Sequence, residues 1–321
     1  MKILINILGL FLLIYSCKSH FLNQNVFPKV RDVSNLIKTD FVPTLESSYI
    51  TEKNTIYGAT IPYAWNEIKN QIGLPLKGFA SKELEKLNNT KSFKDVLKEN
   101  EYETSVEVIG NKIKASAFFK KSLPFEQKLK KFNKPLLFNT IEVESFGFWG
   151  NHSCATLNYF NNENDFSISL FPKNKEHEII LIMNQNESDK LSTFTELFKD
   201  FQQQKKQNVH FNDDDKVEIP IIEFNLEKTY NEFISSEFYT KEAEYVVTKA
   251  YQRNAFVLNE NGAEVESEAK FEVVAASIRF DKPKPKMMIF NKPFVVFLKR
   301  KDAKHPYFGV YIANEELLKK K

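Results

Sequence analysis

Alternation between apolar and polar residues dominates the second half of the chain. Four runs show it, at residues 137–148, 154–160, 166–171 and 178–183, and polar, Asn-rich segments separate them. A period of two places successive side chains on opposite faces of an extended strand. The pattern therefore predicts a series of antiparallel strands joined by short turns.

The longest alternating run covers residues 263–275, between the turn signal Asn261-Gly262 and a Pro-containing segment at 281–286. Its odd positions are small or apolar and its even positions are charged: Ala263, Val265, Ser267, Ala269, Phe271, Val273 and Ala275 alternate with Glu264, Glu266, Glu268, Lys270 and Glu272. This run predicts a strand with one face suited to a core. Two interpretations stay open, an ordinary edge strand and a strand able both to leave a sheet and to join it.

Helical spacing is confined to a few segments. Apolar residues recur at intervals of three and four over 189–204, which predicts a helix capped by Ser188. A second helix is predicted to start at Pro62. Short helices are predicted over 81–98 and 226–233, with Ser81 and Thr90 as caps. Residues 106–114 predict a hairpin that turns at Gly110-Asn111, and residues 217–226 predict a strand.

Composition agrees with a strand-rich globular protein. The chain has 321 residues, and 42% of them are hydrophobic. It contains 30 Phe and 12 Tyr but only nine Gly. Aromatic residues are enriched in strands and bury large areas. The formal net charge of +3 is small for this length, which favours neither a nucleic acid nor an anionic membrane surface as a partner.

The amino terminus predicts export. Residues 3–14 form an apolar run that is too short to span a bilayer and has the length of a signal-peptide core. The following residues, Leu-Ile-Tyr-Ser-Cys at 13–17, resemble a bacterial lipobox. We therefore expect a lipoprotein signal peptide at 1–16, lipidation of Cys17, a tether over 17–48 and a domain at 49–321. The alternative is an ordinary signal peptide that contains a cysteine. Lipidation would leave Cys154 unpaired and the domain without a disulfide.

Catalytic and metal-binding signals are weak. The five histidines show no HExxH motif, and neither a Gly-rich phosphate loop nor a G-x-S-x-G elbow is present. His152 and Cys154 would share one face of a strand, but a buried structural cysteine is the simpler interpretation. The acidic segment 213–215 lacks the spaced ligands of a calcium site and predicts a solvated turn. We expect no enzyme activity, no metal and no cofactor.

Two segments near the carboxyl terminus resemble the serpin family. The sequence FVLNENGAEVESEA at 256–269 resembles the serpin hinge, a Glu-x-Gly-small-Glu run after a hydrophobic strand. The sequence FNKPFVVFLKRKDAKHPYFGVYIAN at 290–314 resembles the serpin carboxy-terminal signature, in which Phe-Asn-Lys-Pro-Phe opens a buried hairpin and an aromatic-Gly-Val strand closes it.

Earlier segments resemble the same family less closely. Residues 113–125 resemble the serpin strand with an Asn-Ala-hydrophobic-Tyr-Phe-Lys-Gly run, with Ser116 in place of Asn and Leu123 in place of the following Trp. Residues 54–62 share Asn54 and Ile56 with an Asn-x-Phe-x-Ser-Pro motif. The region between Pro62 and Ile113 is shorter than in standard serpins. The resemblance implies an α+β serpin-like fold with one large, mostly antiparallel sheet, smaller sheets, few helices and an exposed reactive-centre-like loop at about 262–289.

The resemblance also implies a function, inhibition of a serine or cysteine protease. In serpins a protease cuts the loop, and the amino-terminal part of the loop then inserts as a new strand of the main sheet while the protease is still attached. The implied hinge residues are Glu260, Gly262, Ala263, Glu264, Val265, Ser267 and Ala269.

The family's hinge spacing places the cut bond at Ala276-Ser277, which suits elastase-like or subtilisin-like proteases. Cleavage after Ile278, Arg279 or Phe280 is an alternative, and Arg279 would suit trypsin-like proteases. Glu266 and Glu268 stand where inhibitory members prefer alanine, so a non-inhibitory lipoprotein that acts as a binding module is the second hypothesis. Either form would be a monomer on a bacterial membrane or cell surface, anchored only through its lipid.

Overall fold

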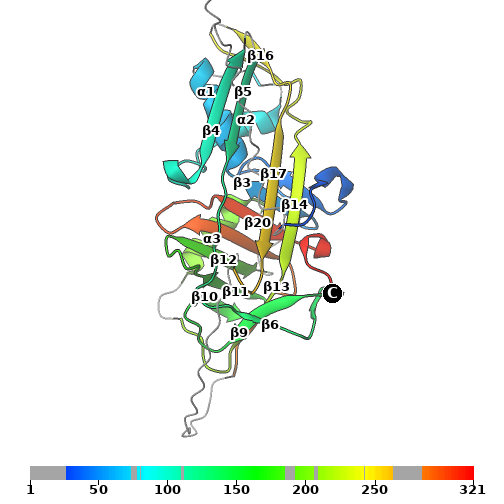
Figure 1. The fold of residues 1–321 in the computed structure, drawn as a ribbon, viewed down its shortest axis with the longest axis vertical. Coiled ribbons are helices and arrows are strands. Elements are labelled where there is room, and N and C mark those ends of the chain that lie inside the picture. The colour runs from blue at the N-terminus through cyan, green and yellow to red at the C-terminus, as the bar shows by residue number, and fades with distance from the viewer. Residues whose placement is uncertain are drawn as a thin grey trace, which may run out of the picture.

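The computed structural model describes residues 27–73, 78–79, 81–109, 112–184, 192–205, 209–241, 243–262 and 284–321. These residues form an elongated α+β structure with one large sheet, several smaller sheets and three α-helices in the described part (Figure 1). The expected α+β class, with a mostly antiparallel main sheet and few helices, is confirmed.

The large sheet has seven strands, which come from the first part, the middle and the last part of the described chain. In spatial order they are β10 (Ala155–Asn162), β11 (Asp165–Leu170), β12 (His177–Asn184), β19 (Phe294–Arg300), β20 (Phe308–Ile312), β3 (Asn54–Gly58) and β2 (Thr39–Val42). Every pair is antiparallel except β2–β3. The predicted alternating runs at 154–160, 166–171 and 178–183 correspond to β10, β11 and β12.

The predicted carboxy-terminal hairpin lies at the centre of this sheet. Every residue of β19 and β20 is buried, and Phe294 pairs with Ile312 across the hairpin. Gly309 lets the strands approach an aromatic ring, because a Cβ at this position would lie 3.1 Å from the ring of Phe297. Helix α3 (Phe194–Gln204) covers the same ring, and the centroids of Phe198 and Phe297 are 5.4 Å apart. Edge-to-face aromatic packing therefore holds the hairpin in the core.

Smaller sheets flank the large one. One contains, in order, β18 (Met287–Ile289), β13 (Lys216–Pro220), β9 (Ser145–Trp149) and β6 (Lys130–Lys131). Another contains β1 (Arg31–Asp32), β14 (Ile222–Thr229) and β17 (Tyr251–Leu258). Three further sheets have two strands each: β4 (Glu103–Ile109) with β5 (Lys112–Phe118), β7 (Leu136–Phe138) with β8 (Ile141–Val143), and β15 (Glu237–Tyr239) with β16 (Glu244–Val246).

Two of the α-helices lie in the first part of the chain. Helix α1 (Thr60–Ile72) follows β3, and α2 (Lys82–Asn89) has the predicted cap, because the Ser81 side chain accepts from the Leu84 N–H. Three short 3-10 helices cover Val33–Asn35, Glu99–Glu101 and Glu315–Leu317. Residues 92–95 lie in the segment 81–98, where we expected one or two short helices, and they form turns. No helix in the described part has the length and hydropathy needed to cross a bilayer.

The folded body begins before Tyr49, which corrects the predicted boundary between tether and domain. Strand β2 (Thr39–Val42) pairs in parallel with β3, and Phe41 is buried in the core. The sequence before Tyr49 shows no sustained period, so periodicity did not reveal a strand of four residues. The tether predicted at 17–48 therefore overlaps the body from β1 onward.

Two other predicted helices also differ from the structure. Helix α3 begins at Phe194 and not at Asp189, because Thr193 and Glu196 form a reciprocal capping box at its start. Residues 226–229 belong to strand β14, whose cross-strand pairing with β17 overrides local helical spacing, and turns follow it. The hairpin predicted at 106–114 is confirmed as β4 and β5, and its turn residues 110–111 lie outside the described residues.

Candidate functional site

The candidate functional site is a groove between β5 and β17. A cavity of about 760 Å³ separates them, lined by residues 113–121 on one side and 251–259 on the other. Among the described strands, β5 pairs only with β4 and β17 only with β14, so each presents an unpaired edge to the groove. Ile61, Ala64 and Ile68 of helix α1 also line it. Figure 1 shows the β4–β5 hairpin beside β17 and β14.

The two strands run in the same direction. Beyond the end of β5, the Phe125 N–H donates to the Asn261 carbonyl at 3.2 Å, and the Leu129 N–H donates to the Glu260 carbonyl at 2.8 Å. The carboxyl ends of β5 and β17 therefore meet at the same end of the groove. A strand that starts at this end and runs back between them would be antiparallel to both, and its backbone groups would face the two unpaired edges.

Gly262 closes this end of the groove and has to be a glycine. Its φ is +72°, and a Cβ would lie 2.4 Å from the Phe125 backbone nitrogen and 2.7 Å from the Leu123 carbonyl oxygen. Only glycine adopts such a conformation without strain and allows so close an approach of two backbones. The Gly262 N–H donates to the Asn259 carbonyl at 3.2 Å, and these two residues form an isolated antiparallel bridge.

The other predicted loop residues are only partly placed. Glu260 is buried beside this turn, with a carboxylate oxygen 3.7 Å from Lys128 Nζ. The remaining hinge residues lie outside the described residues: Ala263, Glu264, Val265, Ser267 and Ala269. The candidate cleavage sites Ala276-Ser277, Arg279 and Phe280 also lie outside them, as does the predicted lipidation site Cys17.

A hydrogen-bonded side chain lies at the floor of the groove. Gln252 Nε2 donates to the Gly58 carbonyl at 3.0 Å and to Thr60 Oγ1 at 2.9 Å, and the Tyr230 hydroxyl donates to Gln252 Oε1 at 2.7 Å. The three bonds connect β17 to the end of β3, the start of α1 and the segment after β14. We did not identify Gln252 from the sequence. The available signal was a pair of amides, Gln252 and Asn254, at the inward positions of an otherwise apolar strand.

Asn54, the first residue of the motif at 54–62, anchors the strand that supports this floor. Its Nδ2 donates to Asn314 Oδ1 at 2.8 Å, and its Oδ1 accepts from the Ala313 and Asn314 backbone N–H groups at 2.8 and 3.0 Å. The side chain is fully buried. Asn54 thus fixes β3 to the segment after β20, and this position gives a structural reason for asparagine in the motif.

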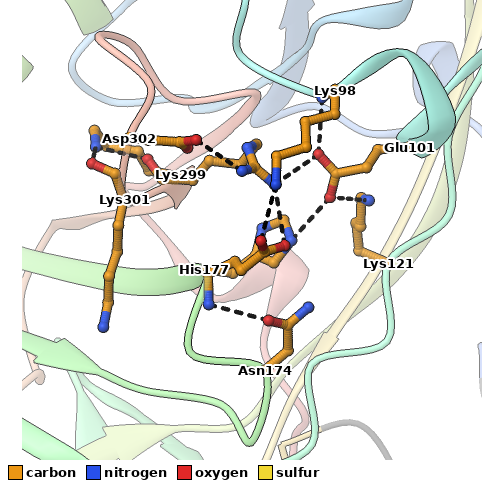
Figure 2. A network of polar contacts seen from close by, with 10 residues as sticks. Lys98, Glu101, Lys121, Asn174, His177, Lys299, Lys301 and Asp302 are labelled. Atoms are coloured by element: carbon orange, nitrogen blue, oxygen red, sulfur yellow. Dashed lines mark hydrogen bonds and ion pairs between the residues drawn. The ribbon is translucent and has the colours of Figure 1, made fainter.

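An ion-pair network ties the start of the β4–β5 hairpin to the main sheet (Figure 2). Glu101 accepts from Lys121 Nζ at 2.6 Å and from Arg300 Nη1 at 2.9 Å, and it lies 3.0 Å from His177 Nε2. Arg300 also pairs with Asp302 at 2.9 Å. Because Glu101 lies two residues before β4 and Arg300 ends β19, the network holds the hairpin in place beside the groove.

The same cluster has the composition of a cation site but not its electrostatics. Ligand atoms of Glu101, Glu176 and His177 lie within 4.8 Å of one another. Lys121 and Arg300 already neutralise Glu101, and their charges would repel a cation. We therefore interpret the cluster as structural.

Burial and charge shift the pKa values within this network. Burial opposes ionisation of Glu101, but hydrogen bonds from Lys121 and from the Lys98 N–H, with the charges of Lys121 and Arg300, lower its pKa to about 2. Burial lowers the pKa of His177, and Glu101 only partly offsets this effect. The native network therefore contains an ionised Glu101 and a neutral His177 near pH 7.

His152 and Cys154 are close together but are not arranged as a reactive pair. Cys154 Sγ lies 3.0 Å from His152 Nδ1, and the cysteine is buried. Burial raises the pKa of the Cys154 thiol to about 11 and lowers the pKa of His152. The thiol therefore stays protonated at neutral pH, whereas a nucleophilic cysteine needs a thiolate.

Comparison with known proteins gives a structural likeness only. No family model and no curated protein matches the chain. Human glycosylated kallistatin matches with a TM-score of 0.40 and 14% identity, over 62% of this chain and 54% of that structure. The thermophilic serpin tengpin in its native state matches with a TM-score of 0.41 and 13% identity, over the same shares. The chain spans about half the length of these structures.

Proposed function

We propose that the protein is a serpin-type inhibitor that traps a serine or cysteine protease by cleavage and insertion of its own loop. One observation carries the proposal. An edge of β5 and an edge of β17, neither of which pairs with another described strand, face each other across a groove, and the hinge-like sequence leaves β17 at the end of that groove. The protein would act as a suicide substrate and not as an enzyme.

The groove suits one additional strand. Residues 263–275 follow Gly262 directly, and their odd positions are small or apolar. If this segment ran back between β5 and β17, its odd side chains would meet the groove floor and its charged even side chains would face outward. Each backbone hydrogen bond to an open edge would contribute roughly 0.5–1.5 kcal/mol net. A strand bonded on both edges would therefore gain several kcal/mol on insertion.

The far end of the loop explains why cleavage would come first. Residues 284–286 lead into β18, which pairs with β13 in the four-stranded sheet. Lys286 is held there by Asp215, whose side chain accepts from the Lys286 backbone N–H at 2.7 Å and from its Nζ at 2.6 Å. An intact loop is thus anchored at both ends. A cut at Ala276-Ser277, or after Arg279 or Phe280, would release the amino-terminal part to enter the groove.

The partner and the location are inferred from sequence. Small residues at Ala276-Ser277 favour elastase-like or subtilisin-like proteases, and Arg279 favours trypsin-like ones. The lipobox at 13–17 supports export and attachment to a bacterial membrane or cell surface through Cys17. We propose that the protein acts there as a monomer.

A protease-trapping assay tests the proposal. The full-length protein is incubated with elastase, subtilisin and trypsin, and the products are separated in SDS. We expect a covalent complex with at least one protease. The matched control is Ala263→Arg, in which a charged side chain would have to enter the apolar groove, so the loop should be cut without a complex.

Other outcomes of this assay are equally informative. Cleavage of the parent protein without a complex and without a gain in thermal stability would contradict trapping and favour the binding-module hypothesis. Amino-terminal sequencing of the released fragment identifies the cut bond and so the class of protease.

A further inference from the structure

The groove between β5 and β17 contains a buried hydrogen-bond donor without a partner. Asn254 lies at an inward position of β17, is only 7% exposed and lines the cavity. Its Nδ2 has no hydrogen-bond partner among the described residues. The oxygen of the same carboxamide packs closely over Gly58, where a Cβ would lie 2.6 Å from Asn254 Oδ1. Buried amide nitrogens usually have an acceptor, so this donor indicates a ligand that supplies one.

Apolar side chains line the groove on both sides of this donor. Phe256 and Leu258 follow Asn254 at the inward positions of β17. On the other side, Gln252 bonds to the start of helix α1, and Ile61 of that helix also lines the cavity. The cavity volume of about 760 Å³ lies within the range of about 300–1,000 Å³ that is usual for small-molecule sites. The groove therefore suits a molecule with a long apolar part and one polar group.

The charged side chains that line the groove are all basic in the described part of the chain. They are Lys114, Lys120, Lys121, Lys249 and Arg253. Lys114 and Lys121 form ion pairs with carboxylates that do not line the cavity. The other three form no ion pair with a described residue. A cleft with apolar walls and charges of one sign concentrates their electrostatic field and attracts the opposite charge. The polar group of the ligand is therefore expected to be an anion.

We propose that this groove binds a long-chain carboxylate, a fatty acid, in the intact protein. One carboxylate oxygen accepts a hydrogen bond from Asn254 Nδ2, and the hydrocarbon chain covers the apolar residues of the groove. The basic side chains around the cavity offset the cost of removing the carboxylate from water. The proposal concerns the uncut protein and needs no protease, so its test is independent of the test for trapping.

Two probes with the same hydrocarbon chain test the charge of the ligand. The intact full-length protein is titrated in a calorimeter with dodecanoate and with dodecyltrimethylammonium, each below the concentration at which it forms micelles. We expect saturable binding of one dodecanoate, at least about tenfold tighter than binding of the ammonium probe. Equal affinities would overturn the choice of an anion. No saturable binding of dodecanoate would overturn the site.

Substitution of Asn254 tests the donor. Asn254→Leu keeps the approximate size of the side chain and removes the amide, so the affinity for dodecanoate should fall about tenfold, the effect of one hydrogen bond to a charged group. The affinity for the ammonium probe should not fall. The matched control is Ser116→Ala, which removes an exposed polar group from the same groove and should leave dodecanoate binding unchanged. An undiminished affinity for dodecanoate in Asn254→Leu would overturn the assignment of Asn254.

A measurement on the parent protein keeps the proposal testable if Asn254→Leu does not fold. A dodecanoate that carries a diazirine is crosslinked to the intact protein by light, and the modified peptides are identified by mass spectrometry. We expect labelling within residues 113–121 and 251–259, which line the cavity. Labelling only outside these two segments would overturn the proposal.

Discussion

Replacing Gln252 by leucine should destabilise the protein through the floor of the groove. The substitution keeps the size of the side chain but removes all three hydrogen bonds, to the Gly58 carbonyl, to Thr60 Oγ1 and from the Tyr230 hydroxyl. Tyr230 is fully buried, so its hydroxyl would lose its partner without gaining water. A buried polar group left unpaired costs about 1–3 kcal/mol. Gly58 and Tyr230 are buried, whereas Thr60 is half-buried and can regain water, so the three groups together should cost roughly 3–5 kcal/mol.

Chemical denaturation and calorimetry measure this change in the free energy of unfolding. For a chain of this size we expect the melting temperature to fall by about 2 °C per kcal/mol, and therefore by roughly 6–10 °C. The matched control is a double-mutant cycle with Tyr230→Phe, which removes the unpaired hydroxyl. Because the two side chains share one hydrogen bond, the double variant should be less destabilised than the sum of the single variants, by about 1 kcal/mol.

Two results would refute this reasoning about Gln252. One is a Gln252→Leu protein that unfolds within about 0.5 kcal/mol of the parent, the range of an ordinary surface substitution. The other is strict additivity in the cycle with Tyr230→Phe, which would mean that the 2.7 Å hydrogen bond contributes no coupling.

Three further predictions concern the hinge and the ion-pair network. Gly262→Ala should lower the free energy of unfolding by about 2 kcal/mol or more in denaturant titrations. The substitution adds left-handed backbone strain of about 1–2 kcal/mol and places a Cβ 2.4 Å from the Phe125 backbone nitrogen. An unchanged free energy of unfolding would contradict that geometry. Ala263→Arg should leave loop cleavage unchanged in gel assays and abolish the SDS-stable complex, whereas a persisting complex would refute insertion. The free energy of unfolding should fall on acidification, because the folded-state pKa values of His177 and Glu101 are both lowered. The loss should begin below about pH 6.5, as the unfolded state protonates His177, and continue between about pH 4.5 and 2 through Glu101. His177→Gln and Glu101→Gln should each flatten the corresponding part of the pH profile, and unchanged slopes would contradict this assignment.

The carboxy-terminal half of the fold was predictable because its signals are local. The strands at 154–160, 166–171 and 178–183 alternate or are continuously apolar, and sequence neighbours pair with each other in the sheet. The buried hairpin of β19 and β20 was predictable from its resemblance to a known signature. Turn chemistry likewise indicated the β4–β5 hairpin.

The remaining features depend on contacts between distant segments. Strand β2 has four residues and is stabilised by parallel pairing with β3, which no local period reveals. The start of helix α3 is set by the reciprocal capping of Thr193 and Glu196, whereas apolar spacing alone suggested an earlier start.

The candidate site also contains some residues that were predictable from the sequence and others that were not. Gly262 was predictable, because a glycine after a strand and a turn signal indicates a special backbone conformation. Gln252 was not, because its importance comes from Gly58, Thr60 and Tyr230, which are remote in sequence. The open edges of β5 and β17 were also beyond a sequence argument, since an unpaired edge is a property of the whole sheet arrangement.

Hydrogen–deuterium exchange before and after loop cleavage tests the central claim most directly. The peptides to follow cover Lys112–Phe118 of β5 and Tyr251–Leu258 of β17, whose facing edges pair with no other strand that the structure describes. We predict that cleavage slows exchange in both peptides and leaves the buried strand β19 unchanged, because a new strand would bond to both edges at once. Unchanged exchange in β5 and β17 after complete cleavage would contradict the account.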